Sequence, residues 1–179
     1  MMRALCLLSS LIAAGILADA QSDPVPNSEL AVRTTSGTYS GFVNSTTPDV
    51  NIWLGIPFGT PPVGARRFLK AEKAPDYGVA NATAYKPICF QDNNRTTGVF
   101  WTLVPEFQNT DTEDEDCLYL NIWAPRKPLG AKKVPVIIWV FGGGFREGGG
   151  HAPYQVPDQW IQKSQTHIVV TFKYETPIA

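Results

Sequence analysis

Apolar residues in the first part of the chain form short runs of strand length. Residues 30–34 and 38–43 are β-prone runs separated by residues 36–37 (SG), a pair typical of a hairpin turn. Residues 50–56 form the next strand candidate. These runs predict a small antiparallel sheet, and the Gly- and Pro-rich residues 57–67 predict a loop after it.

The last third of the chain contains more apolar runs. Residues 118–123 alternate with a period of two, which predicts a strand. Residues 134–141 are almost wholly apolar, which is typical of a strand covered on both faces in a central α/β sheet. A helix is predicted at 157–165 and a second buried strand at 168–174. Strand, glycine-rich loop, helix and strand in this order predict a doubly wound α/β sheet.

Residues 77–116 have no clear period. A loop of this length in a compact domain is usually functional or fixed covalently. Its acidic end, residues 111–116, is interpreted as a solvated loop face in preference to a cation site.

The amino terminus predicts export. A short basic start is followed by the apolar residues 4–17, and residues 18–20 (ADA) fit a cleavage site. We expect a signal peptide at 1–20 and a secreted mature chain at 21–179. The apolar run is short for a membrane span, and no second candidate follows it, so we expect no stable membrane span.

The composition fits an ordinary globular protein, with 44% hydrophobic residues, 17% charged residues and a net charge of −1. It lacks the basic excess of a nucleic-acid binder, so no nucleic-acid partner is expected. The two histidines, His151 and His167, are not at ligand spacing. We therefore predict no metal site.

Three cysteines are present, and Cys6 would leave with the signal peptide. In an oxidising compartment Cys89 and Cys117 most simply pair with each other, closing a loop of about 29 residues that the loop-entropy relation values at roughly 3–4 kcal/mol. Two free buried thiols are the alternative. Three N-x-S/T sequons predict surface positions open to glycosylation, at Asn44, Asn81 and Asn94.

Three consecutive glycines, Gly142, Gly143 and Gly144, follow the apolar strand directly. Ligands of α/β proteins bind at the carboxyl ends of the strands, and glycines allow close approach of the backbone. Fixed backbone N–H groups are what a developing oxyanion needs. A plain turn is the alternative, and the spacing of a phosphate-binding loop is absent.

Three sequence blocks resemble the type-B carboxylesterase family, which includes cholinesterases and fungal lipases. Residues 115–123 (EDCLYLNIW) are similar to the family's signature segment, and residues 54–68 (LGIPFG, then PPVGARRF) to its amino-terminal block. Residues 135–140 (PVIIWV), which run into the glycine loop, are similar to its oxyanion segment. The blocks occur in the family's order and cover about residues 30–171.

This resemblance implies an α/β-hydrolase fold of which only the amino-terminal part is present: a small antiparallel sheet leading into the first strands of a large mixed sheet. It also implies that the N–H groups of Gly143 and Gly144 stabilise the oxyanion, with Gly142 and Phe145 supporting the loop. The implied activity of the full-length parent is hydrolysis of neutral or apolar esters, lipids included. It would proceed through a Ser-His-acid mechanism and an acyl-enzyme, without a cofactor.

The resemblance implies further roles outside the glycine loop. Cys89 and Cys117 match the pair that closes an Ω-shaped loop over the substrate gorge, and Trp101 within it is a candidate for substrate contact, with loop packing the alternative. Arg67 and Glu115 match a partly buried ion pair at the base of this loop, with ordinary surface charges the alternative.

The resemblance stops before a nucleophile is reached. No G-x-S-x-G elbow occurs in the 179 residues, and Ser164 has no strained turn to present it. Residues 173–177 (KYETP) also depart from the family pattern. We expect this chain alone to be inactive, and to expose an unpaired strand edge at 168–172 that promotes aggregation. The alternative function is a non-catalytic, cholinesterase-like secreted binding protein; the oligomeric state is not predicted.

Overall fold

The computed structural model describes residues 24–91, 103–104, 112–127 and 133–176. Three sequence predictions fall outside these residues: the signal peptide at 1–20, the sequon at Asn94 and the substrate contact of Trp101. No helix among the described residues is long and apolar enough to cross a membrane.

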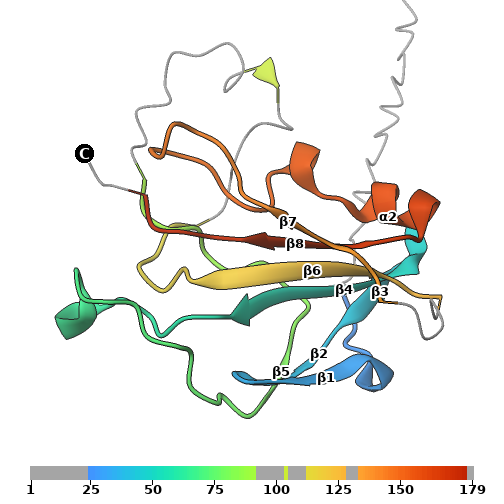
Figure 1. The fold of residues 1–179 in the computed structure, drawn as a ribbon, viewed down its shortest axis with the longest axis horizontal. Helices are drawn as coiled ribbons and strands as arrows, with labels where there is room; N and C mark the ends of the chain where they lie inside the picture. Colours follow the sequence, from blue (N-terminus) through green and yellow to red (C-terminus); the bar gives the residue numbers. More distant parts are fainter. Residues whose placement is uncertain (1–23, 92–102, 105–111, 128–132, 177–179) are drawn as a thin grey trace, which may run out of the picture.

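A small three-stranded sheet forms from the first part of the chain (Figure 1). Its strands lie in the order β1 (Ala31–Thr34), β2 (Gly37–Ser40) and β5 (Val79–Asn81). The predicted hairpin is confirmed, because β1 and β2 are antiparallel. The prediction of a wholly antiparallel sheet is wrong, because β5 pairs with β2 in parallel.

A larger mixed sheet of five strands has the order β3-β4-β6-β8-β7. The first four strands are antiparallel to their neighbours, and β7 is parallel to β8. The bounds are β3 Phe42–Asn44, β4 Thr47–Pro57, β6 Tyr119–Pro125, β7 Val136–Trp139 and β8 Ile168–Phe172. The strand predicted at 50–56 therefore belongs to the large sheet and not to the small one.

The helical segments are short. The helix α2, Asp158–Ser164, lies between β7 and β8 along the chain, as predicted, and contacts β4 and β6. It ends at Gln165, which has the left-handed backbone that often terminates a helix. The described residues also contain three 3₁₀ turns: η1 Ser28–Leu30, before β1, and η2 Gly64–Arg66 and η4 Pro153–Gln155, in connecting segments.

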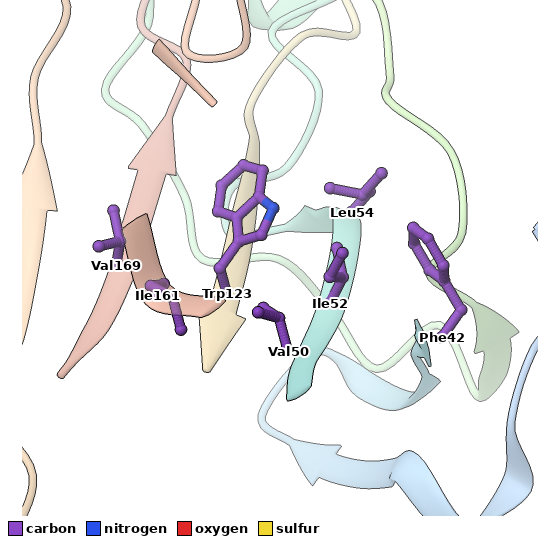
Figure 2. Packing of buried hydrophobic residues seen from close by; sticks show 7 residues of the cluster. All are labelled: Phe42, Val50, Ile52, Leu54, Trp123, Ile161 and Val169. Carbon is purple, nitrogen blue, oxygen red and sulfur yellow. The ribbon is translucent and has the colours of Figure 1, made fainter. Parts of the chain in front are cut away.

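Trp123 on β6 lies in the main hydrophobic cluster, on the face of the large sheet covered by α2. Figure 2 shows its indole between Val169 and Ile161 on one side and Ile52 on the other. Trp123 and Ile161 are almost wholly buried. The complete cluster is Phe42, Val50, Ile52, Leu54, Trp123, Ile161 and Val169.

The opposite face of the large sheet packs on the small sheet. Tyr39 of β2 contacts Trp53 and Ile56 of β4 in a second buried cluster. The Trp53 indole N–H donates to the Leu30 carbonyl at 2.9 Å, so the polar atom of this buried ring is satisfied. The small sheet thus buries its apolar face on β4.

The strand β7 is not buried on both faces as predicted. Each of its four residues is exposed, because β7 is the outermost strand and pairs only with β8 among the described residues. The unpaired edge predicted for residues 168–172 is also wrong, because β8 is paired with β6 on one side and β7 on the other. The exposed apolar edge of this sheet is therefore Val136–Trp139.

We predict that Trp123→Ala lowers the free energy of unfolding by about 3–5 kcal/mol, because it removes a large buried side chain and leaves a cavity. The measurement is chemical denaturation followed by circular dichroism. Trp160→Ala is the matched control, because Trp160 on α2 is 53% exposed. Equal losses from the two variants would contradict a core centred on Trp123.

Candidate active site

The glycine loop follows β7 and turns sharply. The φ angles of Gly143, Gly144 and Phe145 are 136°, 63° and 60°, all in the left-handed half of the map. The carbonyl of Gly143 accepts hydrogen bonds from the N–H groups of Arg146 at 3.1 Å and Glu147 at 3.3 Å. A Cβ on residue 143 would lie 1.9 Å from the Glu147 carbonyl oxygen, so this turn requires glycine.

The N–H groups of this loop lie outside the sheet ladder. In the described part of the chain, neither Gly143 nor Gly144 donates its N–H to a protein acceptor. Residues 142–145 are exposed, and the Phe145 side chain extends into solvent. Two backbone donors are therefore available to a ligand at the carboxyl end of β7. Their assignment as an oxyanion hole stays a prediction.

Tyr174 anchors the beginning of the loop. Its ring stacks on Phe141 with 4.1 Å between centroids, and its hydroxyl donates to the Phe141 carbonyl at 2.8 Å. Burial raises the pKa of the Tyr174 phenol, so the hydroxyl keeps its proton at neutral pH. This role was not predicted from the sequence, where Tyr174 is only the last residue of the strand predicted at 168–174 and part of the departure from the family pattern at 173–177.

Gln91 anchors the end of the loop. Its side-chain Oε1 accepts from the N–H of Gly148 at 2.7 Å, and its Nε2 donates to the Gly148 carbonyl at 3.1 Å. Gly148 lies against the loop's start, since an added Cβ would lie 2.5 Å from the Phe141 ring and 2.6 Å from the Gly142 oxygen. The sequence analysis also missed Gln91, which gives no pattern signal beyond its position two residues after Cys89.

The disulfide between Cys89 and Cys117 is confirmed, with an S–S distance of 2.00 Å and a Cα–Cα distance of 4.9 Å. Both cysteines are buried with Leu118, so the alternative of two free thiols is wrong. The bond joins the segment before Gln91 to the residues that enter β6.

Arg67 and Glu115 form the predicted ion pair. The Nε–Oε1 distance is 2.5 Å, and a second contact joins the guanidinium to Oε2 at 2.7 Å. The hydrogen bond and the charge of Glu115 raise the pKa of Arg67. The Arg67 side chain is 55% exposed and that of Glu115 is 27% exposed, so only the glutamate is partly buried. Solvent weakens an ion pair that is this exposed. The pair therefore orients the base of the loop and contributes little to the stability of the fold.

A cavity of about 450 Å³ lies beside this ion pair, with the disulfide and Thr176 in its wall. None of its lining residues belongs to the glycine loop. The cavity and the candidate oxyanion donors are therefore separate features of the described structure.

The residues after β8 are packed against the segment that leads to the disulfide. Lys173 is 1% exposed, and its ammonium donates to the carbonyls of Lys86 and Pro87. The Thr176 hydroxyl donates to the Phe90 carbonyl at 2.8 Å. These contacts connect the end of β8 to both sides of Cys89.

The two histidines and Ser164 lie outside the glycine loop. His151 is buried and stacks on Tyr85, and His167 is buried against Trp160. The Oγ of Ser164 lies 3.5 Å from Nδ1 of His167, at the end of α2. No group of three or more metal-binding side chains occurs within the described ranges.

Two of the predicted glycosylation positions can be placed. Asn81 is exposed on β5. Asn44 is half-buried, and its Oδ1 accepts from the N–H of Thr46 at 3.1 Å. Modification at either position stays a prediction.

The comparisons with known proteins agree with this architecture. A profile of the carboxylesterase family matches residues 28–177. Chlorogenic acid esterase of Aspergillus niger is 37% identical over an alignment covering 99% of this chain and 36% of that protein. Secreted lipase 5 of Gibberella zeae is 31% identical over 93% of this chain and 35% of its own length. A thermophilic PNB esterase structure has a TM-score of 0.69 at 32% identity, covering 82% of this chain and 28% of that one.

The sheet and its glycine loop thus define part of an α/β-hydrolase fold, which the solved esterases share. The chain belongs to the carboxylesterase family. It spans about a third of the length of the relatives that it matches.

We predict that replacing both Cys89 and Cys117 by alanine lowers the free energy of unfolding by about 3–4 kcal/mol, because the unfolded chain is no longer closed into a loop. Denaturant titration of the oxidised protein measures the difference. A reductant should lower the stability of the wild type to that of the variant and leave the variant unchanged. A variant as stable as the oxidised wild type would show that the disulfide does not contribute to the free energy of unfolding.

Proposed function

We propose that this chain is the oxyanion-binding part of a secreted carboxylic ester hydrolase. The observation that supports the proposal most directly is the glycine loop after β7. It leaves the N–H groups of Gly143 and Gly144 without a protein acceptor among the described residues. In an ester hydrolase such donors bind the carbonyl oxygen as it becomes negatively charged.

The chemistry needs donors that are in place before the reaction. When a nucleophile attacks an ester carbonyl, the oxygen gains negative charge, and donors already held in position stabilise it without reorganisation. The turn closed on the Gly143 carbonyl and the anchors at Phe141 and Gly148 support such a fixed arrangement. No metal or organic cofactor is needed for this step.

The nucleophile of this reaction would be a serine activated by a histidine and an acid, as in other hydrolases of this fold. The 179 residues contain no G-x-S-x-G elbow. In this proposal the triad comes from further sequence of the parent enzyme. The present chain alone would bind a carbonyl oxygen but not transfer an acyl group.

Neutral or apolar esters, lipids included, are the proposed substrate class. Two of the similar proteins are named as an esterase of chlorogenic acid and as a secreted lipase, which agrees with this class. Secretion is also part of the proposal. It is supported by the apolar amino terminus, the sequons and the disulfide. A non-catalytic binding protein is the alternative, and it gives no reason for a turn that tolerates only glycine at position 143.

We predict that Gly143→Ala lowers kcat/KM for a p-nitrophenyl ester by about 10²–10³-fold, because the Cβ would displace the turn that presents the oxyanion donors. The protein translated from the complete transcript is assayed, and that transcript should encode a G-x-S-x-G elbow. Gly64→Ala is the control, because residue 64 also has a left-handed φ of 58° but no atom near its Cβ position. Equal activity of the two variants, or serine-inhibitor-sensitive turnover by the 179-residue chain alone, would contradict the proposal.

Secretion has its own test. We predict that the product secreted by eukaryotic cells begins near Gln21 and shows a glycosidase-sensitive mobility shift that Asn81→Gln reduces by one glycan. Thr83→Ala should have the same effect because it destroys the same sequon, and Thr83→Ser should keep the glycan. Retention of residues 1–20 in the product would refute the signal peptide.

A further inference from the structure

The side chain of Gln91 bonds to both polar groups of one backbone residue. Its amide accepts from the Gly148 N–H at 2.7 Å and donates to the Gly148 carbonyl at 3.1 Å. Gln91 is only 6% exposed, so its end of this pair of bonds is shielded from water. A primary amide is the neutral side chain that offers a donor and an acceptor side by side, which matches a peptide N–H and C=O.

The position of Gly148 affects the rest of the glycine loop. Gly148 lies so close to Phe141 and to the Gly142 carbonyl that a single methyl group would not fit between them. One residue before it, the N–H of Glu147 bonds to the Gly143 carbonyl. A displacement of Gly148 would therefore move the turn that contains Gly143.

The glycine stretch of the loop has no side chains of its own to maintain its shape. The neighbouring Phe145 and Arg146 are exposed. Glycine also has the largest backbone freedom to lose. Tyr174 at Phe141 and Gln91 at Gly148 hold the two ends of the loop, on either side of this stretch.

Gln91 is itself held by the disulfide frame. Its Nε2 also donates to the carbonyl of Cys89 at 3.4 Å, and Cys89 is bonded covalently to Cys117. The neighbouring Phe90 carbonyl accepts from Thr176. The backbone before Gln91 is thus fixed by a covalent bond and by the end of β8.

We propose that Gln91 is a positioning residue that holds the glycine loop in its ligand-binding shape and couples that shape to the Cys89–Cys117 disulfide. Its relevance to ester hydrolysis rests on the function proposed above. Its effect on the loop is a structural claim that can be measured without any substrate.

The test is hydrogen–deuterium exchange of the Arg146 and Glu147 amides, measured by mass spectrometry on the disulfide-bonded protein from the complete transcript. Both amides donate to the Gly143 carbonyl, whereas the Gln91 side chain bonds to Gly148, so the amides report on the turn and not on the mutated contact. We expect Gln91→Ala to accelerate their exchange by roughly 10-fold or more, since two hydrogen bonds that hold the turn are lost.

Gln162→Ala is the matched control. Gln162 on α2 makes the same kind of two-point contact, accepting from the Asp49 N–H at 2.9 Å and donating to the Asp49 carboxylate at 3.0 Å. It should leave exchange at Arg146 and Glu147 unchanged. Equal acceleration by both variants would mean general destabilisation and would overturn the proposal.

Gln91→Glu distinguishes positioning from simple space filling. An ionised glutamate can accept from the Gly148 N–H but cannot donate, whereas a protonated glutamate can accept from this N–H and donate its one O–H to the Gly148 carbonyl. Protection of Arg146 and Glu147, corrected for intrinsic exchange, should therefore recover as the pH falls through the pKa of the new carboxyl group. The wild type should show no such step, and pH-independent protection in Gln91→Glu would overturn the proposal.

Reduction of the disulfide tests the coupling. It should accelerate exchange at Arg146 and Glu147 in the wild type but add little in Gln91→Ala, where the connection is already broken. Additive effects would show that the disulfide and Gln91 act independently, against the proposal. Gln91→Ala could accelerate exchange in a protein that hydrolyses no ester. This result would refute the proposed function and leave the positioning role of Gln91 intact.

Discussion

The parallel pairing of β7 with β8 is the constraint on which the candidate site depends. Parallel strands end at the same edge of a sheet, so the glycine loop after β7 and the residues after β8 emerge together. Phe141 then stacks on Tyr174, and the Tyr174 hydroxyl bonds to the Phe141 carbonyl. In any other register these contacts, and the start of the loop with them, would be lost.

The disulfide adds a second constraint from a distant part of the chain. Cys89 belongs to a segment far from β7 in sequence, yet Lys173 and Thr176 bond to carbonyls on both sides of it. In the same segment, the side chain of Gln91 accepts a hydrogen bond from the Gly148 N–H at the end of the loop. The start of the loop is thus held from the sheet and its end from the covalent frame, which suits a backbone in which three consecutive residues have no side chain.

The exposed face of β7 also has a physical explanation. A parallel strand in an α/β protein is normally covered on both faces, and residues 134–141 have the apolar composition of such a strand. Among the described residues β7 has a single neighbour, and the chain spans about a third of its relatives' length. The apolar composition of β7 thus suits a covered strand, whereas its side chains are exposed. The proposal that this chain is part of a larger enzyme explains the difference, because further sequence would cover the strand.

The sequence by itself determined the runs that form β1, β4, β6, β7 and β8, the helix α2, the cysteine pairing and the family, because apolar periodicity, cysteine number and motif order are local signals. It missed β5, and it predicted one strand at 38–43 where the chain forms β2 and β3 in different sheets. Only the tertiary structure decided that β4 belongs to the large sheet, that β8 is paired on both edges and that β7 is exposed, because pairing partners are remote in sequence. It also decided the anchoring roles of Tyr174 and Gln91. A tyrosine or glutamine gives no pattern signal, and its function arises when folding places it against a particular backbone group.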